Sequence, residues 1–284
     1  MVRNPMNYHQ VSEVILIPEL VDCIVFWTKD PREIIDRLGQ LDRYQYYFHV
    51  TITPYDRSVE PRVPSKKAVV ESFKELSNKV GKQRVIWRYD PIILTHRFNL
   101  DFHASSFSEL AALLTGYTDR CVISFLDVYK KIERNVRAMG QPLDEQATWA
   151  LADKIAAIAE RHNIVIESCC EVVDLSFLGI RHGRCIDDRL ISEITGKPIN
   201  VPKDKGQRKA CGCVASVDIG AYNTCRHGCL YCYANFSAKA IESNVRMHDT
   251  RSPLLVGEIT PHDKVKRRKV PNHKANSLGL FPDL

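Results

Sequence analysis

Short apolar runs alternate with helix-like segments along most of the chain, and this alternation constrains the fold more than any other feature. The runs are rich in β-branched residues and are followed by polar or turn residues, as expected for strands buried on both faces of a sheet. Six candidate strands lie at residues 23–29, 47–53, 84–90, 121–128, 163–169 and 215–221. Helical spacing occupies residues 31–41, 65–80, 106–115, 144–162 and 237–249. The pattern predicts an α/β fold of six βα units in a partial (β/α)6 barrel.

The composition is that of a globular protein. With 284 residues, of which 44% are hydrophobic and 26% charged, it excludes disorder, collagen-like repeats and a coiled coil. No run approaches the roughly 18 consecutive apolar residues of a membrane span. The first ten residues, MVRNPMNYHQ, lack the apolar region of a signal peptide. We therefore expect a cytoplasmic protein with no membrane partner.

Ten cysteines in such a compartment indicate metal or redox chemistry rather than disulfides. Cys23 and Cys121 lie in apolar runs and are expected in the core, because free cysteine is among the most buried residue types. The other eight all lie beyond residue 168. Such crowding is difficult to explain by packing alone.

Cys225, Cys229 and Cys232 form a C-x3-C-x2-C triplet in which Tyr231 immediately precedes the last cysteine. Three thiolates on a short loop can hold three corners of a [4Fe-4S] cluster and leave the fourth iron open to a substrate or cofactor. Zinc is the alternative metal. It would need a fourth ligand, for which the sequence offers Cys211, Cys213 and His227.

The triplet resembles the signature of the radical S-adenosylmethionine (SAM) superfamily, C-x3-C-x-aromatic-C. The resemblance implies that the open iron binds SAM and that reductive cleavage gives methionine and a 5′-deoxyadenosyl radical. It also implies an external electron donor of the flavodoxin or ferredoxin type. Radical SAM enzymes carry the triplet after their first barrel strand, whereas here it follows the last candidate strand. We therefore expect a circularly permuted barrel of radical SAM type in which the cluster-bearing strand is last.

Three longer segments, FWTKDP, RYDPI and DIGAYNTCRHGCLYCYA, are similar to an uncharacterised bacterial domain family with a C-terminal radical-SAM-like cysteine cluster. Spore photoproduct lyases, which are DNA-repair radical SAM enzymes, are similar in three places: the end of the cysteine loop, a Thr-Lys after a strand, and an R-x-D-P-I segment. This partial similarity makes nucleic acid the first substrate class to consider.

Ligands of βα barrels gather at the carboxyl ends of the strands. Lys29 ends the first run, and the resemblance implies that its ammonium pairs with the SAM carboxylate; a solvated lysine is the alternative. Arg88 could pair with a carboxylate and Asp90 could accept from ribose hydroxyls, unless the two form a structural ion pair. Tyr231 completes the cofactor-binding set, together with residues that could face the same cavity: Ser124, Asp127, Tyr129 and Lys130.

A second group of cysteines could hold a second, fully ligated [4Fe-4S] cluster or a zinc ion. The preferred ligands are Cys170, Cys185, Cys211 and Cys213. Cys169 competes with its neighbour, and reduced thiols without a metal are the other possibility. Cys169 and Cys170 lie at the end of the fifth candidate strand whereas Cys211 and Cys213 precede the sixth, so parallel strands would place the two pairs on opposite rims. The insertion between them must bridge that distance.

The predicted barrel spans residues 1–250, including a cysteine-containing insertion at 171–213, and a basic tail occupies 251–284. The tail has seven Lys or Arg residues against three Asp or Glu, most densely at 264–269. It could neutralise nucleic-acid phosphates; a solvated terminal segment is the alternative. We expect a radical SAM enzyme of unknown substrate. The alternative is a zinc- or cluster-stabilised nucleic-acid-binding protein without catalysis.

Overall fold

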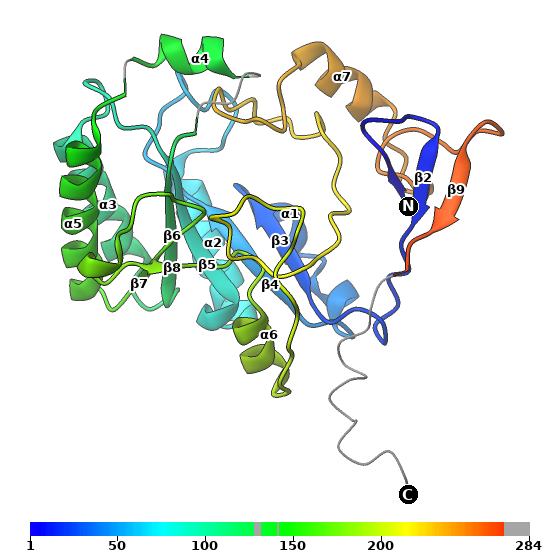
Figure 1. Ribbon diagram of the computed structural model, residues 1–284, viewed down its shortest axis with the longest axis horizontal. Helices are drawn as coiled ribbons and strands as arrows, with labels where there is room; N and C mark the ends of the chain where they lie inside the picture. The colour runs from blue at the N-terminus through cyan, green and yellow to red at the C-terminus, as the bar shows by residue number, and fades with distance from the viewer. Residues whose placement is uncertain (128–131, 141, 270–284) are drawn as a thin grey trace, which may run out of the picture.

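A computed structural model describes residues 1–127, 132–140 and 142–269 of the chain. Its centre is a six-stranded sheet in which each strand pairs in parallel with the next along the sequence (Figure 1). The strands are β3 (Ile24–Thr28), β4 (Tyr46–Thr51), β5 (Val85–Ile92), β6 (Arg120–Phe125), β7 (Val165–Ser168) and β8 (Arg181–His182). The predicted α/β class is confirmed, as are the first five predicted strands.

The helices of the described chain include the five predicted segments, although the one expected at 106–115 begins earlier, at Leu100. They are α1 (Arg32–Ile35), α2 (Lys66–Val80), α3 (Leu100–Leu114), α4 (Glu133–Ala138), α5 (Glu145–Arg161), α6 (Asp188–Thr195) and α7 (Ala238–Arg246). The side chains of Ser65, Asn99 and Asp144 each accept a hydrogen bond from a first-turn backbone amide of α2, α3 and α5. Such caps satisfy amides that the helix itself leaves without a partner.

Both faces of the sheet are covered, which explains why its strands are apolar on both sides. One face packs against α1, α2, α3 and α5 in the largest apolar cluster, which includes Phe48, Trp87 and Ile123. The opposite face carries Tyr47, Ile86 and Val122 and is covered by α6 and by Ile199, Val201 and Val214. We call this second side the inner face. Cys121 lies in the first cluster and Cys23 packs at the edge of the second.

The prediction of a strand at 215–221 is wrong. These residues are all described and form none of the strands, and most are exposed. The sixth place in the sheet belongs instead to β8, from the predicted insertion, which pairs with β7 through Glu167 and Ser168. The cluster-bearing strand of the expected permuted barrel is therefore absent from the described residues, and the triplet lies in a long loop between α6 and α7.

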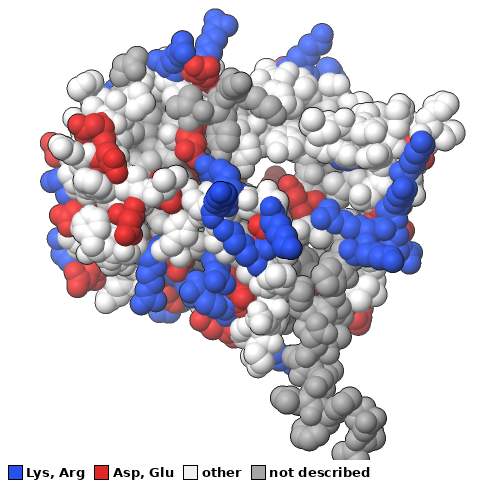
Figure 2. Space-filling view, viewed as in Figure 1, with Lys and Arg blue, Asp and Glu red and all other residues white. Residues whose placement is uncertain are grey.

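A second, three-stranded sheet joins the two ends of the described chain. It consists of β1 (Val2–Arg3), β2 (Gln10–Glu13) and β9 (Lys264–Arg267), with β2 and β9 parallel. The basic run 264–269 is thus largely strand, and all six of its residues are exposed. Figure 2 shows Lys and Arg side chains gathered over this part of the surface. Among the described residues, the helices are all too short or too polar to cross a membrane.

Candidate functional site

The cysteine triplet lies on a loop that packs over the carboxyl-end loops of the parallel sheet. Cys229 and Tyr231 belong to a buried cluster with Tyr55 and Val59, which follow β4, and with Ile93, which follows β5. The same cluster includes Ile132, Val136 and Met139 in and around α4. The loop backbone is tied to the β4 loop, since the amide of Leu230 donates to the carbonyl of Val59 at 3.0 Å.

Polar side chains fix the shape of the triplet loop. Asn223 is buried with a positive φ of 55°, and its Oδ1 accepts from the amides of Phe236 and Ser237 at the start of α7. Asn235 Oδ1 accepts from the amide of Cys225 at 3.2 Å. Cys229 is buried, Cys232 is half-buried and Cys225 is exposed. The three thiols are therefore presented on a braced loop with one side open to solvent.

Lys29 and Tyr231 lie beside the triplet and both bind Glu60, a residue that the sequence did not single out. The Lys29 ammonium donates to Glu60 Oε1 at 2.8 Å and to Thr53 Oγ1 at 3.2 Å, and it lies 5.5 Å from the Tyr231 ring centroid. The Tyr231 hydroxyl also donates to Glu60 Oε1. Glu60 is 2% exposed, so this carboxylate organises a buried charged network directly beneath the loop.

A second ammonium, that of Lys66 at the start of α2, pairs with the other oxygen of Glu60. Burial alone would raise the pKa of Glu60, but Lys29 and Lys66 lower it to about 2. The carboxylate is therefore ionised at neutral pH. No periodic pattern marks Glu60, because it lies in the irregular segment between β4 and α2; an acidic residue among prolines was the only available signal.

Arg88, Asp90 and Ser124 are brought together, but with the second cysteine group rather than the triplet. Alternation along β5 and β6 turns all three toward the inner face. Arg88 donates to Asp90 Oδ2 from Nε at 2.9 Å and also from Nη2, and Ser124 donates to Asp90 Oδ1. Arg88 Nη1 donates to Cys185 Sγ at 2.9 Å. Arg88 and Asp90 thus form the ion pair that was the alternative interpretation of these two residues.

The four preferred cysteines of the second group form one buried cluster on the inner face: Cys170, Cys185, Cys211 and Cys213. Cys169 packs against it, and its Sγ lies 3.1 Å from that of Cys185. The concern about opposite rims does not arise, because no described strand directly follows Cys211 and Cys213, which lie in the segment that folds back over the inner face. All ten cysteines are free thiols in the structure.

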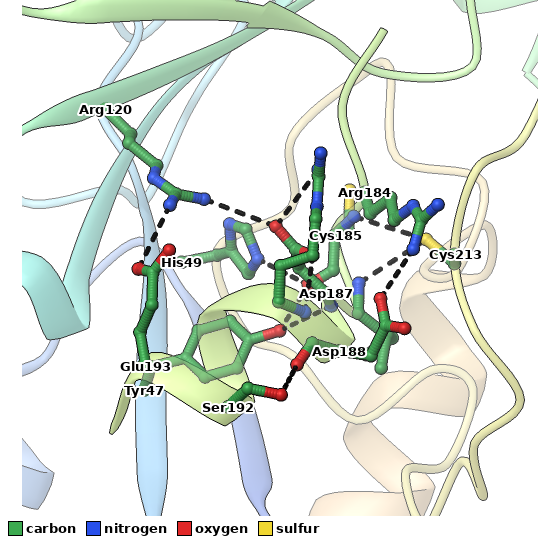
Figure 3. A network of polar contacts seen from close by, with 12 residues as sticks. Tyr47, His49, Arg120, Arg184, Cys185, Asp187, Asp188, Ser192, Glu193 and Cys213 are labelled. Atoms are coloured by element: carbon green, nitrogen blue, oxygen red, sulfur yellow. Dashed lines mark hydrogen bonds and ion pairs between the residues drawn. The ribbon is translucent and has the colours of Figure 1, made fainter. Parts of the chain in front are cut away.

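Buried polar residues beneath this cluster hold the segment 185–187 in place (Figure 3). The Cys185 carbonyl accepts from the Tyr47 hydroxyl at 2.8 Å and from His49 Nε2 at 2.9 Å. Tyr47 in turn accepts from the amide of Asp187, whose carboxylate pairs with Arg120. Burial and the charge of Arg88 lower the pKa of His49 to about 3, so the imidazole is neutral.

The other residues considered for the site lie elsewhere. Asp127 pairs with Arg208 at the surface. Tyr129 and Lys130 lie outside the described residues. Among those that are described, no group of three or more His, Cys, Asp or Glu side chains is arranged around a point where one metal ion could bind.

The chain matches one protein family over most of its length. A model described as Domain of unknown function (DUF1848) matches residues 1–234. The chain belongs to this family. The matched region contains all ten cysteines, Lys29 and Glu60, and it ends two residues after Cys232, before α7 and β9. No curated protein matches the chain.

The donor set of the DUF1848 triplet fits an iron–sulfur cluster. Thiolates are the ligands of [4Fe-4S] clusters, and three of them leave one iron open. The loop supplies three thiols and the buried ring of Tyr231, and the ammonium of Lys29, which follows β3, lies beside this ring. Chemically, this arrangement can hold an electron-transferring centre next to a cation that binds an anionic group.

Proposed function

We propose that this protein is a radical SAM enzyme in which Cys225, Cys229 and Cys232 hold a [4Fe-4S] cluster. When bound, such a cluster supplies reductive cleavage of SAM to methionine and a 5′-deoxyadenosyl radical, with the electron delivered by an external flavodoxin- or ferredoxin-type donor. The proposal rests on one observation: the triplet loop packs over the carboxyl ends of a parallel sheet, beside the partly buried ammonium of Lys29. This is the end of βα folds where ligands gather.

The chain's own residues would bind and orient SAM. An ammonium has three donors, and Lys29 uses two of them on Thr53 and Glu60 among the contacts described. The third can donate to the SAM carboxylate. Glu60 fixes the position of Lys29 without titrating near neutral pH, and the ring of Tyr231 closes one side. Arg88 is already engaged by Asp90 and Cys185, so we assign Lys29, rather than Arg88, to the carboxylate.

The test is anaerobic purification followed by analysis of iron, zinc and acid-labile sulfide, and then incubation with SAM and a reductant. We expect a brown protein that releases 5′-deoxyadenosine. Cys229→Ala should abolish this release, whereas Cys23→Ala, which changes a cysteine outside both groups, should retain it. A colourless protein with stoichiometric zinc would overturn the proposal and favour a zinc-stabilised binding protein. A brown protein that neither binds nor cleaves SAM would indicate an electron carrier.

Nucleic acid is the substrate class that we propose to test first. The six residues 264–269 are all exposed, and five of them are Lys or Arg. Phosphate contacts of this kind weaken steeply with salt. Binding of duplex DNA that falls with rising salt, and falls further on replacing Lys264 and Lys266 by Gln, would support the proposal. Equal binding by this variant would exclude a role for β9.

A further inference from the structure

The cysteine cluster of the inner face draws its members from three separate stretches of chain. Cys170 follows β7, Cys185 lies between β8 and α6, and Cys211 and Cys213 lie in the segment after α6. All four are 7–8% exposed. Aliphatic side chains fill the core elsewhere in the protein, so packing alone does not explain why four thiols from three segments lie together here. The convergence calls for a ligand that takes four thiolates.

Hydrogen-bond donors are directed at the sulfur atoms. The amides of Cys185 and Ile186 point to Cys213 Sγ at 3.3 and 3.4 Å. Arg88 Nη1 lies 2.9 Å from Cys185 Sγ. Donors of this kind stabilise negative charge on sulfur, and hydrogen bonds to sulfur set the reduction potentials of iron–sulfur clusters.

The backbone that carries these cysteines is rigidly placed. Tyr47 and His49 both donate to the Cys185 carbonyl from β4, as Figure 3 shows. The two glycine segments also touch: a Cβ on Gly212 would lie 2.8 Å from the Gly183 carbonyl oxygen. Only a residue without a side chain allows Cys211 and Cys213 to approach the Cys185 segment this closely.

We propose that Cys170, Cys185, Cys211 and Cys213 hold a second [4Fe-4S] cluster, one that is ligated entirely by the protein. This site is separate from the triplet and does not rest on the radical SAM assignment. Its four thiolates each take one iron, so the cluster has no open position for SAM.

The spacing of the cysteines favours a cluster over zinc. Structural zinc sites use pairs of the form C-x2–4-C around a single centre, whereas this group has a C-x-C pair and two single cysteines. A cluster of four irons is larger than one ion, and its thiolates bind different metal atoms.

Cys170 is the fourth ligand, and Cys169 is not. Cys170 is buried with the other three cysteines, and its φ of 59° turns the chain at the end of β7. A non-glycine residue in this region is uncommon and marks a position that the surrounding structure enforces. Cys169 is only half-buried and packs against the cluster of four from outside it.

The cluster would tie the segment 171–213 to the sheet. Because the ligands come from three stretches, loading the site removes freedom from the whole segment, and metal binding becomes part of folding. We therefore expect amides of residues 183–187 and 210–214 to exchange with solvent slowly in the iron-loaded protein. They should exchange much faster after iron is removed by a chelator.

Iron analysis of anaerobically purified full-length variants tests the site independently of the triplet. In Cys225→Ala/Cys229→Ala/Cys232→Ala we expect about four iron and four sulfide atoms per chain, with no SAM cleavage. Adding Cys211→Ala and Cys213→Ala should remove this iron. Cys169→Ala in the triplet-free variant should retain it, and Cys170→Ala should lose most of it. A triplet-free protein that folds, as judged by circular dichroism, but holds no iron or holds zinc instead would overturn the proposal.

A second measurement covers the case in which the triplet-free variant does not fold. Cys211→Ala/Cys213→Ala in the otherwise unchanged chain should lower the iron content from about eight to about four atoms. An unchanged iron content would contradict the second cluster. If instead the unchanged chain holds about four iron atoms and loses none on triplet removal, the second cluster stands and the radical SAM assignment fails.

Discussion

Arg88 Nη1 donates a hydrogen bond to Cys185 Sγ over 2.9 Å, although 97 positions separate the two residues in the chain. The guanidinium thereby links the middle of β5 to the cysteine cluster of the inner face. It also pairs with Asp90, which accepts from Ser124 on the neighbouring strand. One buried cation thus connects two strands of the sheet with the segment that covers it.

Replacing this cation should destabilise the protein. Arg88→Met removes the ion-pair partner of the Asp90 carboxylate and one donor to the Cys185 sulfur, and breaking a buried pair in this way costs about 3 kcal/mol. Arg88→Met/Asp90→Asn should recover part of the loss, because no partly buried charge is then left without a partner. The measurement is urea unfolding of anaerobically purified protein. Arg134→Met, on the exposed side of α4, is the control and should change the free energy of unfolding by less than about 0.5 kcal/mol.

Glu60 should make the protein sensitive to strong acid. Its pKa is about 2 in the folded protein and near 4.5 when unfolded, so the unfolded chain binds more protons between these values. Its stabilising contribution is complete above pH 4.5 and is lost as the pH falls through 2. The full loss is about 3 kcal/mol. Glu60→Gln should reduce this part of the pH dependence, whereas Glu71→Gln, at an exposed position of α2, should leave it unchanged.

His103 should contribute in a higher pH range. Its Nε2 faces the Ile93 carbonyl at 3.1 Å and must carry a proton, so Nδ1 accepts from the Tyr89 hydroxyl at 2.9 Å. Burial lowers the pKa of this imidazole to about 4. The unfolded chain therefore takes up a proton first, and stability falls as the pH drops from 6.5 to 4, by about 3 kcal/mol in total.

Urea unfolding of the unchanged protein and of His103→Gln at pH 7 and pH 4.5 measures this contribution. The variant should be less stable at pH 7, but its stability should depend less on pH across the interval. Parallel pH curves for the two proteins would show that His103 is not the titrating group.

The contact between Gly212 and Gly183 predicts an effect confined to the inner face. Gly212→Ala places a Cβ 2.8 Å from a backbone oxygen, and forcing the two segments apart should cost about 1–3 kcal/mol. Hydrogen exchange should then increase at residues 183–187 before it increases in α2 or α3. Gly39→Ala is the matched control, because a Cβ at that position meets no atom within 4 Å; its exchange pattern should be unchanged.

Lys29 and Lys66 bind opposite oxygens of Glu60, and this symmetry allows a controlled test of SAM binding. Both Lys29→Met and Lys66→Met remove one ion pair from the same carboxylate, but in the described contacts it is Lys29 that lies over the Tyr231 ring. Losing a charge-assisted hydrogen bond should weaken SAM binding to Lys29→Met about 10- to 100-fold. Isothermal titration of the anaerobic proteins should show a much smaller change for Lys66→Met. Equal losses would mean that Lys29 acts only through Glu60.

Local patterns allowed much of the sheet to be predicted. The five apolar runs became β3 to β7, and Ser65 and Gly81 mark the two ends of α2. Alternation along the strands also places Arg88, Asp90 and Ser124 on one face. These predictions succeed because strand period, helix period and caps depend on neighbouring residues.

The sequence by itself also determined which residue types are available for chemistry: a triplet of cysteines with its tyrosine, and four further cysteines that could share a site. Only the tertiary structure decided that the four further cysteines meet on one face of the sheet and that β2 pairs with β9. It also decided that Glu60 is the partner of Lys29 and Tyr231. The tertiary structure also decided that residues 215–221, which are apolar enough for a strand, form none, and that β8 is the sixth strand of the sheet. Each of these depends on the path of irregular segments through space, and such paths are set by long-range packing and buried charge pairing that leave no periodic signal in the chain.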